Sequence, residues 1–397
     1  MQQQIMILSG QPKINCDIYG KKVAVFIHLH YRETLNKYFD YMMCIPESVP
    51  IYVSSSDKWI KEEVCKYAVR QKRNIIAFYK ENRGRDITAL LVTFRKIMLQ
   101  YKYVCFLHDK KEKCERDKND IMLWVDNLWS NLLGREGTGY FFEVLELLEE
   151  DESLGLLVPP EPIGEIFTPY NGWTETNVLQ TRNLAEELKI CADINPDIDK
   201  QPIAVGTCFW ARTYAIKKIL MKNWTYEDFD DEPLPEDAKS YAVERIFGYL
   251  AKDAGYHSYI AMNKEYAAIY MNFLIECRRK AFQVIENRYE VCNLYGIAQL
   301  KKLLEYVSAH KVAYIYGAGK IGMGVYRYLT DMGYFPQGFL VSKKDRDYSQ
   351  MPIQVLSVEQ LLYEDGIGII VAVGKQTKLA VVKVLEEKKI KDYFCMR

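Results

Sequence analysis

The chain has 397 residues, in which 53 basic side chains balance 53 acidic ones. This length allows two or three domains with a sizeable core, and the balanced charge argues against a general attraction for nucleic acid. No run approaches the roughly 20 apolar residues of a membrane span, and the first ten residues do not resemble a secretory signal. The ten cysteines form no CxxC pair, which favours reduced thiols in a cytoplasmic protein over a zinc site.

The first 110 residues alternate β-rich runs with helical segments. Strands are predicted at 23–30, 50–55, 75–79 and 103–108, and helices at about 33–44, 58–71 and 85–99. Strands that alternate with helices of this length indicate βαβ units and a parallel sheet. Because such sheets bind ligands beyond the carboxyl ends of their strands, the residues that follow each strand are the first candidates for a site.

The pattern changes after residue 111. We predict helices at 121–134 and 140–150, a strand at 154–160 and a long polar loop at 161–177. An apolar run at 203–212, an acidic loop at 227–237 and a further helix at 240–255 follow. The segment 258–295 has an irregular to helical pattern. A helix at about 296–309 then precedes a new strand, so we expect two domains, 1–305 and 306–397.

ENRGRD at 81–86 follows the third predicted strand and opens a helix. Gly84 permits a tight turn and close approach of a ligand, and Asp86 complements the dipole of the first helical turn. Arg83 and Arg85, beside a helix N-terminus, suit a diphosphate. A capped, solvent-exposed loop fits the same residues equally well.

LHDKK at 107–111 directly follows the fourth predicted strand. Its one carboxylate, Asp109, makes at most a weak metal site, since hard cations prefer several oxygen ligands. His108, Lys110 and Lys111 complete the motif, and lysines can neutralise a diphosphate without a metal. The position favours a binding role over a plain charged turn.

GTCFWAR at 206–212 is the third candidate. Gly206 and Thr207 are predicted to end a short apolar strand. Trp210 offers a stacking face for a sugar, although Trp in an apolar run more often packs in a core.

YAVER at 241–245 follows the acidic loop. A helix that starts near Lys239 puts Asp237 at its start and Glu244 inside it. Either carboxylate is suited to removing a proton from a hydroxyl group.

The order ENRGRD, LHDKK, GTCFWAR, YAVER and then AGY at 254–256 resembles the rhamnan synthesis protein F family of polysaccharide glycosyltransferases over about residues 20–260. ENRGRD and GTCFWAR carry the most specific similarity. The family typically has HTK where this chain has His108, Asp109 and Lys110. Nucleotide-sugar transferases commonly place an acidic metal-binding motif here, so the departure leaves open whether Asp109 restores some metal binding.

The resemblance implies an α/β, GT-A-like domain with a mostly parallel sheet that transfers a sugar, often rhamnose from dTDP-rhamnose, to a growing glycan. It implies Glu244 as the catalytic base with Asp237 as its rival. From the chemistry of the motifs themselves, we expect a sugar or acceptor pocket at Gly206, Thr207 and Trp210. We likewise expect donor binding by the residues of the first two motifs: Arg83, Gly84, Arg85, Asp86, His108, Asp109, Lys110 and Lys111.

The C-terminal segment contains Gly317, Gly319 and Gly322 in GxGxxG spacing, between a predicted strand and a helix. This context suits a dinucleotide loop, but the acid that would hold a ribose hydroxyl is missing from the end of the next strand, 338–342. With a further strand at 367–374, the segment predicts a small Rossmann-like domain. A structural, sugar-nucleotide or assembly role is favoured over NAD(P) binding.

The expected partners are a nucleotide sugar and a glycan or lipid-linked acceptor, with a peripheral association at the inner face of the membrane if the acceptor is lipid-linked. No cofactor is required by the sequence, and a divalent metal is compatible with it. Two alternatives stay open. One is an NAD(P)-dependent sugar-nucleotide oxidoreductase or epimerase, and the other is a non-catalytic scaffold of a polysaccharide assembly complex.

Overall fold

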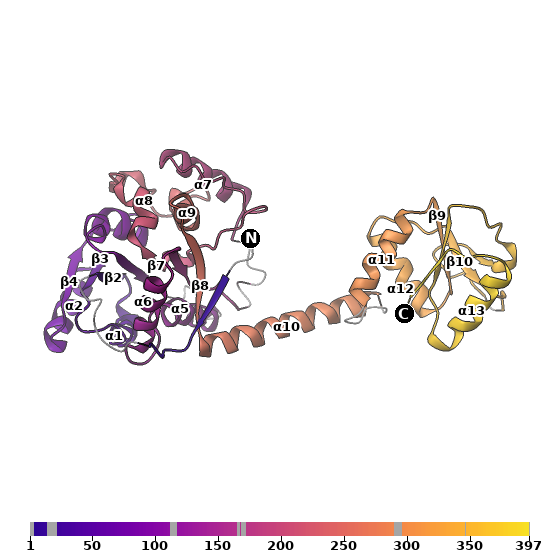
Figure 1. Ribbon diagram of the computed structural model, residues 1–397, viewed down its shortest axis with the longest axis horizontal. Coiled ribbons are helices and arrows are strands. Elements are labelled where there is room, and N and C mark those ends of the chain that lie inside the picture. The colour runs from indigo at the N-terminus through magenta and orange to yellow at the C-terminus, as the bar shows by residue number, and fades with distance from the viewer. Residues whose placement is uncertain are drawn as a thin grey trace. The chain divides into compact units, whose positions relative to one another are not determined.

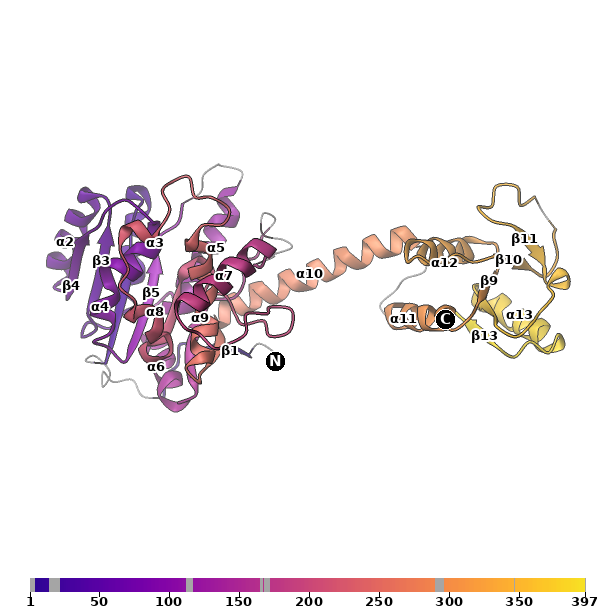
Figure 2. The same cartoon turned by 90° about the horizontal axis from the view of Figure 1, so that it is seen from above.

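The computed structural model describes residues 4–13, 22–111, 117–164, 167, 172–289, 296–345 and 347–396. The chain divides into two compact units, Met1–Met271 and Asn272–Arg397. Each unit is built on its own sheet with helices packed against it (Figures 1 and 2). The expected α/β class, with a large, mostly parallel sheet and a second small parallel sheet, is confirmed.

Among the described residues, the large sheet has eight strands in the order β1-β8-β6-β7-β5-β2-β3-β4. Every neighbouring pair is parallel except β5–β7 and β6–β7. The strands are β1 (Gln4–Leu8), β2 (Val23–His28), β3 (Ile51–Ser55), β4 (Ile75–Tyr79), β5 (Tyr103–His108), β6 (Leu154–Val158), β7 (Phe209–Arg212) and β8 (His257–Asn263).

Two hydrophobic cores cover the two faces of this sheet. Val25 and Ile27 of β2 belong to the core that contains side chains of α1, α2, α5 and α6, whereas Ala24 and Phe26 belong to the core formed with α3, η2, α4, α7, α8 and α9. These central strands are apolar on both faces because helices cover both. The helices are α1 (Leu35–Met42), α2 (Lys58–Gln71), α3 (Arg85–Thr88), the π-helical η2 (Ala89–Phe94), α4 (Arg95–Met98), α5 (Lys118–Leu133), α6 (Gly139–Glu150), α7 (Glu175–Glu187), α8 (Lys217–Met221) and α9 (Lys239–Asp253).

The strand order reverses between β2 and β5. The chain adds β3 and β4 on one side of β2 and then crosses back to place β5 on its other side. His28 and His108, the last residues of β2 and β5, are directly paired in register. A reversal of this kind opens a crevice at the carboxyl ends of the strands, where ligands of parallel sheets bind.

Several predicted elements need correction. β1 was not predicted, and β8 lies within the segment 258–295 expected to be irregular to helical. The remainder of that segment that the structure describes is mostly the helix α10 (Lys264–Tyr289). Gly206 and Thr207 precede β7 rather than end a strand, because both have left-handed backbone conformations, with φ of 64° and 54°.

The second unit contains a parallel sheet in the order β11-β10-β9-β12-β13. The first strand of this sheet, β9, is central, with β10 on one side and β12 on the other, as in doubly wound sheets. The elements are α11 (Gly296–Ser308), β9 (Val312–Tyr316), α12 (Lys320–Asp331), β10 (Gly338–Val341), β11 (Val355–Ser357), β12 (Ile367–Val371), α13 (Lys375–Glu387) and β13 (Tyr393–Cys395).

The division between the units falls upstream of the boundary expected near residue 305. Leu300, Leu303 and Val307 of α11 share a core with Ala313 and Ile315 of β9. The apolar face of α11 is therefore covered by the small sheet, and this helix belongs to the second unit.

Candidate active site

Side chains from motifs far apart in the sequence converge at the carboxyl end of β5. His108, which ends β5, is buried, and Asp86, in the first turn of α3, is half-buried; His108 Nε2 lies 3.9 Å from Asp86 Oδ2. A Cβ placed on Gly206 would lie 3.2 Å from Lys110 Cε and 3.6 Å from His108 Nε2. ENRGRD, LHDKK and GTCFWAR thus contribute to one cluster, at the crevice expected from the strand order.

Asp86 is the carboxylate at the centre of this cluster. Burial alone would raise its pKa, but His108, Lys110 and the hydroxyl group of Thr207 together outweigh that effect and lower the pKa of Asp86 below its usual value. The effect of Thr207 indicates that its hydroxyl group lies close to this carboxylate. Asp86 therefore joins α3 to the turn before β7, in addition to any effect on the helix dipole.

His108 is held as a neutral imidazole. Burial lowers its pKa, and its Nδ1 lies 2.8 Å from the backbone oxygen of Asp109. A carbonyl oxygen only accepts, so Nδ1 carries the proton and Nε2 is the unprotonated nitrogen. Among the described residues, Nε2 has no hydrogen-bond partner, and its lone pair faces the cluster with Asp86 and Gly206.

Two turns with left-handed backbone build the site. Gly84 and Arg85 have φ of 63° and 48°, and Gly206 and Thr207 have φ of 64° and 54°. Arg and Thr rarely adopt this conformation, and Thr is further restricted because it is β-branched. Backbone strain of this kind concentrates at functional sites, and here the two turns are joined through the Asp86–Thr207 contact.

Glu244 is the second carboxylate of the cluster. Its Oε1 accepts the backbone N–H of Gly206 at 2.5 Å, and its Oε2 lies 3.2 Å from Arg245 Nη1. α9 thereby positions the turn that contains Gly206. Asp237, the rival carboxylate, is exposed just before α9, and the structure does not bring it into this cluster.

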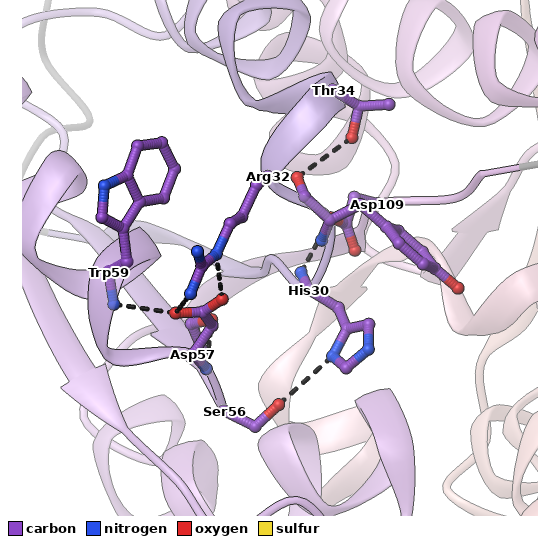
Figure 3. Close-up of polar contacts among 9 residues, drawn as sticks. His30, Arg32, Thr34, Ser56, Asp57, Trp59 and Asp109 are labelled. Atoms are coloured by element: carbon purple, nitrogen blue, oxygen red, sulfur yellow. Dashed lines mark hydrogen bonds and ion pairs between the residues drawn. The ribbon is translucent and has the colours of Figure 1, made fainter.

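Asp109 binds the backbone of the loop after β2 (Figure 3). Its Oδ2 accepts the N–H groups of His30 and Tyr31, each at 2.7 Å. In the same loop, His30 Nδ1 lies 3.2 Å from Ser56 Oγ, and Arg32 forms a two-bond pair with Asp57. Asp109 thus fixes the shape of this loop. Its Oδ2 is used for these two hydrogen bonds and is not left open for a metal.

Metal ligands are scarce around this carboxylate. Within the described ranges of the chain, no group of three or more His, Cys, Asp and Glu side chains could hold a metal ion. The residues present therefore do not fit the weak metal site considered at Asp109, and we derive no chemical step from a metal.

The cationic side chains lie at the same edge of the sheet. Lys80, which follows β4, is buried; its Nζ donates to the backbone oxygen of Arg83 at 3.2 Å, and burial lowers its pKa to about 8. Lys110 Nζ lies 4.2 Å from the centre of the Trp124 ring. Lys111 is paired with Glu33, in the turn before α1, at 2.9 Å.

Arg83 and Arg85 are engaged by the segment before α9. Arg83 Nε donates to the backbone oxygen of Phe229 at 3.0 Å and lies 3.4 Å from Asp231 Oδ1. Arg85 forms a two-bond pair with Glu232, with Nη2 2.8 Å from Oε2. Both guanidinium groups therefore contact the same short segment of the chain, and both lie against its acidic residues.

Trp210 does not offer a face to a sugar. Its side chain is fully buried, its Nε1 donates to the backbone oxygen of Leu132 at 2.7 Å, and its ring packs on Phe141. Trp210 alternates with Phe209 along β7, so it points into the core on one face of the sheet. The prediction of a stacking role is wrong.

Two residues of the site were not predicted. His28 is buried at the end of β2, its Nδ1 lies 3.0 Å from Ser54 Oγ, and burial lowers its pKa to about 3. Lys80 directly follows β4. Lys80 follows the strand predicted at 75–79, so the rule that singled out the residues after the fourth strand would have found it. His28 was missed because the first strand was predicted to run to residue 30, whereas β2 ends at His28.

The family comparison covers the segment that contributes these residues. The model of the rhamnan synthesis protein F family matches residues 5–256, which contain all four motifs. The chain belongs to this family. Its membership supports a role in polysaccharide synthesis. No curated protein matches the chain, and no helix in the described part is both long and apolar enough to span a bilayer.

Proposed function

We propose that this member of the rhamnan synthesis protein F family is a glycosyltransferase. It transfers a sugar, with rhamnose the first candidate, from a nucleotide-sugar donor to a growing cell-surface polysaccharide or a lipid-linked acceptor. The observation that supports this best is the convergence of Asp86, His108, Lys110, Gly206 and Glu244 at the carboxyl end of β5, where the strand order reverses. Family membership supports a polysaccharide as the product to which the sugar is added.

The donor diphosphate is proposed to lie against Arg83, Arg85 and Lys110. Two guanidinium groups can each bind phosphate oxygens through paired hydrogen bonds. Developing negative charge on the leaving diphosphate would be stabilised by cations already in place, which is the main contribution that such a site makes to the rate. This scheme requires no metal, and transfer is expected to persist when a chelator is added.

In the proposed step, the oxygen of an acceptor hydroxyl group forms a bond to the anomeric carbon of the donor sugar. The bond between that carbon and the diphosphate oxygen breaks, and the nucleoside diphosphate leaves with the electron pair. For transfer with inversion, a carboxylate takes the hydroxyl proton. Glu244 is the preferred base because it reaches the cluster, whereas Asp237 is exposed beyond it.

Glu244→Gln tests this assignment. The amide oxygen of Gln can still accept the Gly206 N–H, so the turn should persist while the base is lost. We expect transfer to fall by about 10²-fold or more, with the Trp fluorescence of the folded protein unchanged. Asp237→Asn is the matched control and should retain activity. The measurement is transfer and hydrolysis of dTDP-rhamnose, UDP-sugars and GDP-sugars by the purified protein, with and without chelator.

Three outcomes would count against the proposal. If no nucleotide sugar is hydrolysed or transferred by the wild type, the chain is better explained as a scaffold. If Asp237→Asn abolishes transfer and Glu244→Gln does not, the base is the rival carboxylate. If chelation abolishes transfer reversibly, the account in which cations replace a metal is wrong.

A further inference from the structure

A short acidic segment lies on the arginine pair of the proposed site. We call residues 230–237 the acidic strap; they read DDEPLPED. Asp231 lies 3.4 Å from Arg83 Nε, and Glu232 forms its two-bond pair with Arg85. Glu232 therefore occupies donor groups of Arg85 that a diphosphate would use, and Asp231 places a negative charge beside Arg83.

Both ends of the strap are fixed, whereas its middle is exposed. Phe229 is buried, with its ring 5.4 Å from that of Trp224, and Ala238 is buried at the start of α9. Between these two residues, every strap residue except Asp230 and Leu234 is exposed. The segment can therefore change its contacts with the arginines without loss of its anchors.

The contacts between strap and arginines are of a kind that opens readily. The side chains of Arg85, Glu232 and Asp231 are 46%, 52% and 78% exposed. Ion pairs this exposed shift an equilibrium by no more than about fivefold each, because water screens the charges. A diphosphate, with more oxygen acceptors and more charge than a carboxylate, can displace them.

We propose that the acidic strap is an internal competitor of the donor, in which Asp231 and Glu232 stand in for the diphosphate on Arg83 and Arg85 until the donor displaces them. The proposal rests on the proposed function, because it takes the arginine pair as the phosphate site. It adds a regulatory consequence: the occupancy of the site depends on how strongly the strap holds the arginines.

The first experiment measures binding of inorganic pyrophosphate and of dTDP to the full chain by titration calorimetry. Glu232→Gln keeps the size of the side chain but removes its charge, and we expect binding about two- to fivefold tighter than in the wild type. Glu236→Gln is the matched control, because it removes the same charge from the same strap at a residue for which the structure gives no contact with either arginine. This variant should bind pyrophosphate with the affinity of the wild type. Arg85→Ala should bind at least about tenfold more weakly.

The three variants separate failure of this inference from failure of the proposed function. Unchanged binding in Arg85→Ala overturns the phosphate site itself. Weaker binding in Arg85→Ala with unchanged or weaker binding in Glu232→Gln overturns the strap alone. Equal tightening in Glu232→Gln and Glu236→Gln also overturns it, because a general change of charge would then explain both.

Hydrogen exchange provides an independent test. If pyrophosphate displaces the strap, amides of residues 230–237 should exchange faster in its presence, while those of β5 stay protected. Slower exchange in the strap would mean that it closes over the ligand, and would overturn competition even if the affinities agreed.

Discussion

At the scale of single residues, the site is built from polar groups that hold one another before any ligand arrives. Glu244 accepts from Gly206, Asp109 accepts from the loop after β2, and Asp86 lies close to the hydroxyl group of Thr207. Buried polar groups need such partners, because each unsatisfied one costs free energy. The cluster is therefore preorganised, which is what stabilisation of a developing charge requires.

Asp109 gives the clearest prediction at this scale, because one of its oxygens accepts two N–H groups. Asn supplies the same carbonyl oxygen, whereas Ala leaves the N–H groups of His30 and Tyr31 without their acceptor. We expect Asp109→Ala to lower the free energy of unfolding by about 1–3 kcal/mol for each N–H group, and Asp109→Asn to lower it much less. Urea unfolding followed by Trp fluorescence measures both, since all six tryptophans lie within residues 1–271.

The wild type and Asp109→Asn are also expected to differ in how their stability depends on pH. Burial raises the pKa of Asp109 to about 7 in the folded protein, above its value in the unfolded chain. Between these two values the folded state binds more protons, so the wild type should lose stability relative to Asp109→Asn as the pH rises through about 7. Curves for the two proteins that run parallel from pH 5 to 8 would contradict the raised pKa.

The sequence predicted most of these residues but not their contacts. Asp86, His108 and Lys110 could be found because they follow strands or begin a helix, and the rule for parallel sheets then places them together. The stacking role of Trp210 was predicted wrongly because an apolar run does not reveal toward which face of the sheet a side chain points. The partners of Arg83 and Arg85 lie about 145 residues further along the chain, a distance over which sequence pattern alone gives no pairing.

At the scale of elements, the burial pattern of each strand decides whether it could be predicted. The buried runs of β2, β3 and β5 are easily recognised because both of their faces are apolar. β8 begins with exposed and half-buried residues, so its pattern is mixed, and β1 lies at the edge of the sheet with Ile5 and Ile7 exposed. The helix expected at 85–99 is interrupted by the π-helical η2, a feature often found near functional sites.

Gly84 tests the importance of the turn that carries the arginines. A Cβ at this position would lie 2.3 Å from Thr88 Cγ2 and 3.1 Å from Phe229 Cβ, so Gly84→Ala should add overlap to the cost of a left-handed backbone. Gly137 has a similar φ of 60° with nothing within 4 Å, and Gly137→Ala is therefore the control for the backbone term alone. We expect Gly84→Ala to be less stable than Gly137→Ala by about 1–3 kcal/mol, measured by urea unfolding. Equal losses would show that the turn can relax.

At the scale of the whole molecule, the sequence predicted two units but assigned the helix at 296–309 to the first domain as a linker, whereas α11 packs in the core of the second unit. The helix pattern of 296–309 was clear, yet nothing local shows which sheet its apolar face meets. Because Leu300 and Leu303 pack with the second unit, a cut after residue 289 is preferable to one near residue 305. The fragment 1–289 contains all four motifs and should bind pyrophosphate with the affinity of the full chain.

Substitutions in the glycine loop of the second unit separate transfer from the dinucleotide alternative. A Cβ at Gly319 meets nothing within 4 Å, whereas one at Gly322 would lie 1.8 Å from the backbone oxygen of Gly317. Gly319→Val should therefore fold and block only a ligand at the loop, while Gly322→Val should disrupt the unit itself. We expect Gly319→Val to retain sugar transfer. Loss of transfer in a folded Gly319→Val protein would favour the oxidoreductase or epimerase alternative.

The pairing of β1 with β8 has a consequence for how the protein is made. Gln4 pairs with Tyr259, so β1, which is synthesised before the other described strands of its sheet, waits for β8. β2 to β5 can pair among themselves much earlier, and closure of long loops slows the formation of distant contacts. We therefore expect the sheet to grow outward from β2 during synthesis. The apolar side chains of β1 stay unpaired through most of translation, a period in which they are open to chaperones and to aggregation.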